Sequence, residues 1–198
     1  MCQLDPDSRS ANGGARPLTV ALVADTHGYL DVRVAAGVRG CDLAVHAGDV
    51  GGVAVLDALR PRGPVHAVKG NNDTRAKWPR AEQPLLATLP AEVTLPLPGG
   101  VLVVVHGDRA LPARRRHARL RAAYPDARAI VYGHSHRLCC DQEKIPWVVN
   151  PGAAGRSRTY GGPSFVVLRI EREEWSLETR RFEPLSPVRE RATRTAGS

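Results

Sequence analysis

Five short motifs in this sequence place a glycine near carboxylate, amide or imidazole side chains. In chain order they are Asp25-Thr26-His27-Gly28, Gly48-Asp49, Gly70-Asn71-Asn72-Asp73, His106-Gly107-Asp108 and Gly133-His134-Ser135-His136. Carboxylate oxygen and imidazole nitrogen are suitable ligands for Mn²⁺, Fe, Zn²⁺, Ni²⁺ and Co²⁺, and the lack of thiolates in the motifs argues against a structural zinc site. The chemistry that these residue types indicate is therefore metal binding.

The number of candidate ligands indicates more than one ion. Two aspartates, one asparagine and four histidines are available, namely Asp25, His27, Asp49, Asn71, His106, His134 and His136. One ion needs fewer ligands, whereas two ions about 3.5–4 Å apart can use all of them if one carboxylate bridges. Only one residue separates His134 from His136, so a turn is needed to direct one imidazole at each ion.

Each motif taken alone has an ordinary structural explanation. An aspartate two residues before a histidine is commonly a surface turn, and Gly-Asp after a strand is common turn chemistry. A single histidine such as His106 is more often a structural residue than a ligand. The two imidazoles of His134 and His136 in one glycine-introduced turn have little structural purpose. The ordered set, rather than any single motif, favours a metal centre.

The elements before these motifs are predicted to be buried parallel strands. Residues 18–24, 43–47 and 65–69 are short apolar runs, as expected of strands covered on both faces. Residues 32–39 and 53–60 between them have helix-compatible patterns. Alternating strands and helices at this spacing predict βαβ units. In an open α/β sheet the strand C-termini converge on one crevice where ligands bind.

The second half of the chain is predicted to form further strands around one helix. Residues 92–97 and 101–106 are typical of a hairpin, residues 111–123 of a helix, and residues 74–89 and 137–146 of loops. Further strands are expected at 129–132, 147–150, 164–170 and 175–182. The predicted fold is an α/β architecture in which a two-sheet β-sandwich is flanked by helices.

Length and composition predict one domain, at residues 17–182, between disordered tails at 1–16 and 183–198. The N-terminal stretch has no apolar segment typical of a secretory signal, and the chain has no run of eighteen apolar residues that could span a membrane. The chain has four cysteines, Cys2, Cys41, Cys139 and Cys140, and no two of them form a C-x-x-C motif, so neither a structural zinc site nor a redox motif is indicated. Such sparse cysteine usage suits a reducing compartment, so a cytoplasmic location is expected.

The net charge of +8 comes largely from arginines that crowd residues 114–121 and 180–194. A basic surface attracts polyanions, but arginine also serves as an ordinary solvated cation. No cluster of aromatic residues that could stack on bases accompanies these arginines. A nucleic-acid partner is therefore a less favoured alternative to a small phosphate ester.

The ordered motifs D-T-H-G, G-D, G-N-N-D, H-G and G-H-S-H resemble those of the calcineurin-like metallophosphoesterase superfamily. The resemblance covers residues 18–182 and is narrower to the small single-domain bacterial and archaeal phosphodiesterases, which share their fold with a retromer subunit. Asn150-Pro151-Gly152 also resembles a segment of this branch. The resemblance implies a fold of two sheets between helices and a phosphoesterase that uses two divalent metal ions, with Mn²⁺ favoured and Fe, Ni, Zn or Co as alternatives.

The resemblance also implies a role for each ligand. Asp25, His27 and His136 would hold one metal, while Asn71, His106 and His134 would hold the other. Asp49 would bridge the two. Hydroxide held between the metals would then attack phosphorus in line with the leaving oxygen, without a covalent enzyme intermediate.

The chain departs from the superfamily pattern at the residue after Asn71. Many members have a histidine there that can protonate the leaving group, whereas this chain has Asn72, which can donate a hydrogen bond but not a proton. Asn72 and Asp73 are the candidate catalytic residues, although Asp73 without its histidine partner could simply cap a turn. Asn72 and Asn150 are the candidate substrate-binding residues. Asp108 replaces a histidine frequent in the branch and is interpreted as a solvated turn residue.

Two other functions are compatible with the same motifs. The basic surface would suit a nuclease or a nucleotide-processing hydrolase, but large substrates generally need an added binding domain for which this chain has no room. A catalytically degenerate scaffold of the same fold would bind a protein partner, but the retained ligand set argues against loss of catalysis. The favoured function is hydrolysis of small phosphodiesters or phosphomonoesters.

Overall fold

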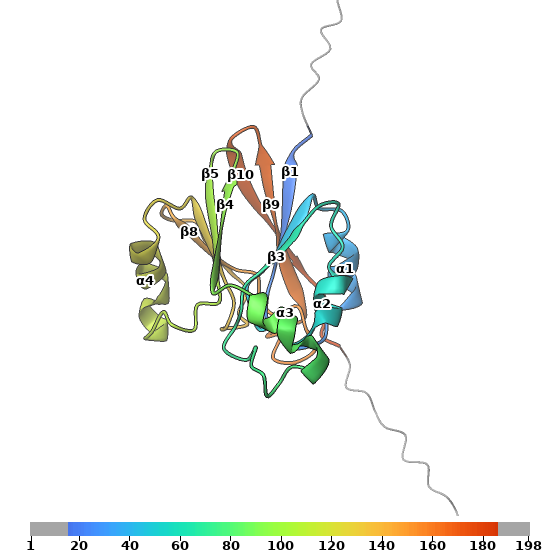
Figure 1. The fold of residues 1–198 in the computed structure, drawn as a ribbon. Coiled ribbons are helices and arrows are strands. Elements are labelled where there is room, and N and C mark those ends of the chain that lie inside the picture. The colour runs from blue at the N-terminus through green and yellow to red at the C-terminus, as the bar shows by residue number, and fades with distance from the viewer. Residues whose placement is uncertain (1–15, 186–198) are drawn as a thin grey trace, which may run out of the picture.

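The computed structural model describes residues 16–185, and within them two five-stranded sheets stack face to face (Figure 1). The first sheet has the order β10-β9-β1-β2-β3 and contains β1 (Leu18–Val23), β2 (Leu43–His46), β3 (Val65–Ala67), β9 (Ser164–Glu171) and β10 (Glu174–Arg181). The second has the order β4-β5-β6-β8-β7 and contains β4 (Glu92–Leu97), β5 (Gly100–Val105), β6 (Ala129–Tyr132), β7 (Cys139–Asp141) and β8 (Trp147–Asn150). The predicted two-sheet architecture is confirmed.

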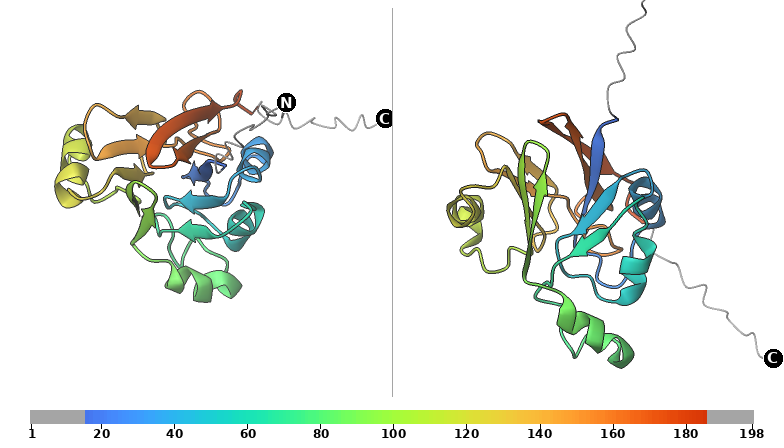
Figure 2. Two further views of the ribbon diagram at one scale, coloured as in Figure 1. Left: turned by 90° about the horizontal axis from the view of Figure 1, so that it is seen from above. Right: turned by 45° about the horizontal axis from the view of Figure 1, so that its top comes forward.

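Helices cover the outer faces of the sandwich. Helices α1 (Val32–Val38) and α2 (Val53–Ala58) lie outside the first sheet, and α4 (Arg116–Ala123) lies outside the second (Figures 1 and 2). Helix α3 (Gln83–Thr88) follows a short 3₁₀ helix at Arg80–Glu82 and lies near the end of the sandwich at which β1 stops (Figure 1).

Burial on both faces explains the unbroken apolar sequence of β1. Val20 and Leu22 pack into the core between the two sheets, whereas Ala21 and Val23 pack into the core beneath α1 and α2. A third cluster, which includes Ile130 and Leu120, fills the space between the second sheet and α4. Alternate residues of a strand point to opposite faces, so a strand that lies between two cores is apolar on both faces.

The sheet topology brings the predicted motifs to one edge. Strand β1 is parallel to β2, and β2 to β3, while β5 is parallel to β6 in the second sheet. Within each sheet these strands therefore end at the same edge, and the two edges meet where the backbone nitrogen of His134, after β6, donates to Oδ1 of Asp25, after β1. Each strand stops one or a few residues before its polar motif, which places the candidate ligands in the connecting loops.

Three expectations about elements were wrong in detail. The helix predicted at 111–123 begins only at Arg116, after a 3₁₀ turn at Ala113–Arg115, because the residue before Pro112 is disfavoured in helical conformation. The predicted loop 74–89 contains α3, and the predicted loop 137–146 contains β7. Strand β7 is a three-residue edge strand paired only with β8, too short for a periodic pattern to reveal.

The predicted disordered tails fall almost entirely outside the described residues and stay predictions. None of the helices within residues 16–185 is both long enough and apolar enough to cross a membrane.

Candidate metal centre

Seven side chains from the five strand ends meet in one place. His27 and His136 approach most closely within the first group, with 3.1 Å between their Nε2 atoms. Nε2 of His136 also lies 3.7 Å from Oδ1 of Asp25. The ligand atoms of this group, completed by Asp49, all lie within 4.8 Å of one another. The group is therefore a potential metal-binding site.

The second group converges on the side-chain oxygen of Asn71. That oxygen, Oδ1, lies 2.9 Å from Nε2 of His106 and 2.9 Å from Nδ1 of His134. Two imidazoles and an amide oxygen from three different loops thus surround one point. These are the three residues that the family resemblance assigns to a second ion.

Asp49 lies between the two groups. Its Oδ2 atom is 3.6 Å from Nε2 of His27 in the first group and 3.4 Å from Nε2 of His106 in the second. The carboxylate is almost completely buried. No other carboxylate among the described residues is within 4.0 Å of a histidine nitrogen in each group.

The hydrogen-bonding state of these residues tests whether a cation fits. Nδ1 of His106 is 2.9 Å from the carbonyl oxygen of Ala47, which can only accept, so Nδ1 carries a proton. When the ring is neutral, Nε2 therefore presents its lone pair to the centre. Asp25 Oδ2 is buried and has no hydrogen-bond partner. Lone pairs that face one another and an unpartnered buried carboxylate oxygen are both satisfied by a cation. The donor set fits a divalent metal.

Strained backbone holds the ligands in place. Asp25, His27, Asp49, His134 and His136 have φ angles between 49° and 66°, in the left-handed region that residues other than glycine rarely adopt. Such conformations persist only where the surroundings fix them, and they cluster at functional sites. Here the chain turns sharply at each strand end, which directs successive side chains into one volume. Residue types and spacing gave no sign of this strain.

Two glycines allow the loops to approach. A Cβ atom on Gly70 would lie 2.2 Å from the backbone nitrogen of Asp49, and one on Gly48 would lie 2.6 Å from Nδ1 of His106. Neither contact is sterically acceptable. The loops after β2 and β3, and the His106 ring, can therefore pack together only because these positions carry no side chain.

Asp73 holds two of these loops together. Its buried carboxylate accepts hydrogen bonds from the backbone nitrogens of Val50, Gly51 and Gly70 at 2.8–3.1 Å, and from Nε1 of Trp78 at 2.9 Å. These four donors occupy both carboxylate oxygens. The arrangement favours a positioning role for Asp73 over the catalytic role expected from the sequence.

Asn72 and Asn150 also support the centre from behind the ligands. Asn72 donates from its backbone nitrogen and from Nδ2 to the two carboxylate oxygens of Asp49, at 2.8 and 2.7 Å. The buried Asn150 donates from Nδ2 to the carbonyl of Gly133 and to Oγ of Ser135, at 2.8 and 3.0 Å. Asn150 therefore braces the turn that carries His134 and His136, and the donors of its amide are used within the protein.

His46 is a buried core imidazole. Its Nε2 atom lies 2.9 Å from Oγ1 of Thr26, between the candidate ligands Asp25 and His27. Burial lowers the pKa of His46 to about 4, so the ring is neutral at neutral pH. It fills the space beneath the centre without adding charge.

Comparison with known proteins identifies the family. Residues 18–173 match the family described as the calcineurin-like phosphoesterase superfamily domain. The chain belongs to that superfamily. A protein of Methanocaldococcus jannaschii described as a probable metallophosphoesterase is 28% identical over 142 residues, which cover 69% of this chain and 68% of that protein.

Solved structures with low sequence identity share the phosphoesterase fold. Wild-type Vps29 of Entamoeba histolytica, in complex with Zn²⁺, has a TM-score of 0.63 at 19% identity and covers 84% of this chain and 99% of its own. An archaeal phosphodiesterase has a TM-score of 0.59 at 19% identity and covers 82% of this chain and 100% of its own. These likenesses establish the architecture and not the reaction.

The electrostatics of this phosphoesterase site are dominated by burial. Burial raises the pKa of Asp25 from its ordinary 3.8 to about 7 and lowers the pKa values of His27 and His134. Burial acts on Asp49 as well, but hydrogen bonds with His106 and Asn72 hold the pKa of its carboxyl well below the usual range. Asp49 is thus an anion at neutral pH.

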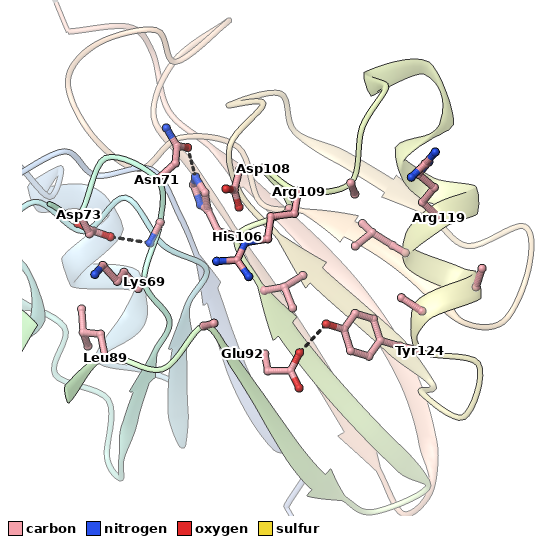
Figure 3. A pocket seen from close by; sticks show the side chains of 18 of the residues that line it. Lys69, Asn71, Asp73, Leu89, Glu92, His106, Asp108, Arg109, Arg119 and Tyr124 are labelled. Atoms are coloured by element: carbon pink, nitrogen blue, oxygen red, sulfur yellow. Dashed lines mark hydrogen bonds between the residues drawn. The ribbon is translucent and has the colours of Figure 1, made fainter. Parts of the chain in front are cut away.

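A cavity of about 690 Å³ opens beside the second group (Figure 3). It begins at Asn71 and His106 and continues between the β4–β5 hairpin and α4. Apolar side chains such as Leu89 and Leu120 form part of its wall, and the guanidinium of Arg109 projects into it (Figure 3). Near its far end, the hydroxyl of Tyr124 donates to Glu92 at 2.6 Å.

Asp108 lines this cavity and is half-buried, so the interpretation as a solvated turn residue describes only part of its surroundings. His117 contacts Oδ2 of Asp141 at 2.8 Å and the hydroxyl of Tyr132 at 3.0 Å. Both contacts are typical of a structural histidine.

Arg158 is a site residue that the sequence did not reveal. Its Nη2 atom lies 3.1 Å from Nε2 of His27. It stands in the loop between β8 and β9, in a chain rich in arginine, and no spacing or pattern distinguishes it from the arginines at the surface. Only the three-dimensional path of the loop brings it to the centre.

Proposed function

We propose that this protein is a two-metal phosphodiesterase that hydrolyses small phosphate esters. The position of Asp49 carries the proposal, because its Oδ2 atom lies within 3.6 Å of histidine nitrogens of both ligand groups. A carboxylate shared by two groups of ligands suits two neighbouring cations. Asp25, His27 and His136 would complete one cation site, and Asn71, His106 and His134 the other.

The donor chemistry favours Mn²⁺, with Fe, Ni, Zn or Co as alternatives. Carboxylate, amide oxygen and imidazole suit these ions, and metal availability contributes to the choice. When bound, the two ions would neutralise charge on the phosphoryl oxygens and activate a water for attack. The protein's own residues would orient the ligands of these ions. Nδ2 of Asn72 donates to the carboxylate of Asp49, and the carbonyl of Ala47 accepts from Nδ1 of His106.

No imidazole serves as a general acid next to Asn71. Asn72 occupies the position, and its amide is already bonded to Asp49. General acid catalysis is worth roughly 10²–10⁴-fold, so its lack predicts a preference for esters with good leaving groups. This preference distinguishes the proposed enzyme from one that cleaves unactivated alkyl esters rapidly.

The cavity beside Asn71 and His106 supports a diester substrate. A phosphodiester carries two organic groups, and a volume of about 690 Å³ next to the centre has room for one of them. The apolar wall favours a group with exposed carbon. Phosphomonoesters could also react, but they would leave this volume empty and gain less binding energy.

A metal-reconstitution assay tests the proposal. Metal-stripped protein would be reloaded with Mn²⁺ and assayed on bis-nitrophenyl phosphate and on nitrophenyl phosphate. We expect diester turnover that exceeds monoester turnover and that is lost in Asp49→Ala and in His134→Ala. Asp126→Ala removes an exposed carboxylate that is not a candidate ligand, so this variant should stay active and serves as the control.

The same assay distinguishes the two alternatives. If wild-type protein is as inactive as Asp49→Ala with Mn²⁺, Fe, Ni, Zn and Co, the catalytically degenerate scaffold is favoured. Cleavage of DNA, with binding that weakens linearly in log salt concentration, would favour the nuclease.

A further inference from the structure

The loop between β8 and β9 crosses the metal centre and carries Arg158 into it. Nη2 of Arg158 lies 3.1 Å from Nε2 of His27, the ring nitrogen that faces Asp49 and His136. Arginine has only donors, so in this contact Nε2 of His27 accepts. Arg158 therefore donates to the Nε2 lone pair of His27 that would otherwise bind a metal ion.

The base of this loop is fixed against the first ligand motif. Ala154 donates to the carbonyl of Ala24 at 3.0 Å and accepts from the backbone nitrogen of Asp31 at 3.0 Å. A Cβ atom on Gly155 would lie 2.5 Å from the carbonyl oxygen of Thr26, so only glycine permits this approach. The loop thus leaves the protein core directly beside Asp25 and His27.

The outer part of the loop is held in a strained conformation. Arg158 and Tyr160 have φ angles of 55° and 41°, in the left-handed region. The ring of Tyr160 lies under the guanidinium of Arg137, 4.3 Å from the ring centroid. Backbone strain of this kind persists where neighbouring contacts impose it, and it is found preferentially at functional positions.

The charge of Arg158 is unexpected beside a cation site. An arginine stays protonated at any physiological pH, and its charge repels a bound divalent ion. A fixed cation next to a metal site becomes favourable when an anion lies between them, and the proposed substrate is an anion.

We propose that Arg158 binds the phosphoryl oxygens of the substrate, from the side of the centre opposite the cavity-lining residues Asn71 and His106. This inference rests on the proposed function, because it assigns a residue to the same site. When a cation takes the lone pair of His27, Arg158 loses its acceptor there, and a phosphoryl oxygen becomes the acceptor within reach. The planar guanidinium can offer two parallel donors to such an anion.

This role complements the substitution at Asn72. Arg158 cannot donate a proton to a leaving group, but it can stabilise negative charge that develops on phosphorus-bound oxygens. The centre would thus rely on charge stabilisation rather than on proton transfer. Arg156, in the same loop, lies over the ring of Tyr29 at 4.4 Å from its centroid and has no contact with a candidate ligand, so it provides a matched control.

The test compares Arg158→Ala, Arg158→Lys and Arg156→Ala in full-length, Mn²⁺-loaded protein. Calorimetry measures the affinity for inorganic phosphate, and separate titrations of metal-stripped protein measure the affinity for Mn²⁺. We expect Arg158→Ala to weaken phosphate binding at least tenfold and to lower kcat/KM for a diester by roughly 10²–10³-fold. Its Mn²⁺ affinity should be unchanged or higher, because a nearby positive charge has been removed. For Arg158→Lys, phosphate affinity and kcat/KM should lie between those of wild type and of Arg158→Ala. For Arg156→Ala, both should stay within about twofold of wild type.

Two results would overturn the inference. If Arg158→Ala and Arg156→Ala bind phosphate equally well, Arg158 does not contact the anion. If Arg158→Ala loses Mn²⁺ affinity in proportion to phosphate affinity, its role is to hold the metal site together. Failure of the proposed function is distinguishable, since wild-type protein would then neither turn over esters nor bind phosphate in a metal-dependent way.

Discussion

Nε2 of His106 and Oδ1 of Asn71 lie 2.9 Å apart, and a contact between these atoms needs either a proton or a cation between them. The proton on Nδ1 of His106 is directed to the carbonyl of Ala47. A neutral His106 therefore opposes its lone pair to that of the amide oxygen, and a second proton on the ring would satisfy the contact in place of a metal. Protons and metal ions compete for the same positions in this centre.

Mn²⁺ affinity should therefore fall as the pH is lowered. Burial opposes protonation of His106, but its hydrogen bond to Asp49 and the charge of that carboxylate raise the pKa of the ring. Burial raises the pKa of Asp25 to about 7. Both groups bind protons more readily than usual, and each must lose its proton to bind metal. We expect Mn²⁺ affinity to drop at least tenfold from pH 8 to pH 6, measured by calorimetry. An affinity independent of pH over this range would contradict the competition.

The variant Asp25→Asn should stabilise the metal-free protein at high pH. The folded protein binds a proton at Asp25 up to about pH 7, whereas the unfolded chain releases it near pH 3.8. The free energy of unfolding therefore falls as the pH rises from about 4 to about 7, and the loss persists above pH 7. Asparagine avoids the buried charge. We expect a gain of the order of 2–4 kcal/mol at pH 8 and little gain at pH 4, since one pKa unit corresponds to about 1.4 kcal/mol.

Urea denaturation of metal-stripped protein measures this difference, with Asp126→Asn as the exposed control. Equal stability of Asp25→Asn and wild type at pH 8 would mean that the Asp25 carboxylate is satisfied without a metal.

The variant Asp73→Ala distinguishes a positioning role from a catalytic one. The substitution leaves the backbone donors of Val50, Gly51 and Gly70 without their common acceptor. Each unsatisfied buried donor costs about 1–3 kcal/mol, so we expect a loss of about 3 kcal/mol or more in the free energy of unfolding. Asp126→Ala should change it by less than about 0.5 kcal/mol. Wild-type stability combined with lost turnover would instead assign Asp73 to catalysis.

The variant Ala123→Trp tests whether the cavity accepts an ester group. Ala123 lies on α4 and lines the cavity, so an indole at this position should narrow it. We expect KM for a naphthyl phosphodiester to rise at least tenfold, while KM for methyl nitrophenyl phosphate changes little. Ala113→Trp, just before α4 and outside the cavity lining, is the control. An equal effect of Ala123→Trp on both substrates would show that the cavity does not bind the larger group.

The sequence predicted most of the sheet because its strands are buried on both faces. Apolar runs around Val20, Val45 and Ile130 indicated β1, β2 and β6 to within one residue at either end. Strand β7 and helix α3 were not predicted, because one has three residues and the other follows a proline-bounded 3₁₀ turn. Short elements at the edge of a fold are set by the neighbours they contact, and those neighbours are distant in sequence.

The sequence also placed the seven candidate ligands at strand ends that the structure brings together. Their mutual approach follows from parallel pairing of β1 with β2 and of β5 with β6. The contacts that support these ligands could not be predicted from the strand pairing. That Asp73 faces Val50 rather than the centre, or that Arg158 reaches His27, depends on loop conformations with positive φ angles, and residue spacing does not encode them.

Anomalous scattering from crystals of the Mn²⁺-loaded protein would show directly whether two ions share Asp49. We expect two peaks per chain about 3.5–4 Å apart, both within bonding distance of the Asp49 carboxylate, and a lost or weakened pair of peaks in Asp49→Ala. A single peak in wild-type protein, or two peaks of which only one contacts Asp49, would contradict this expectation.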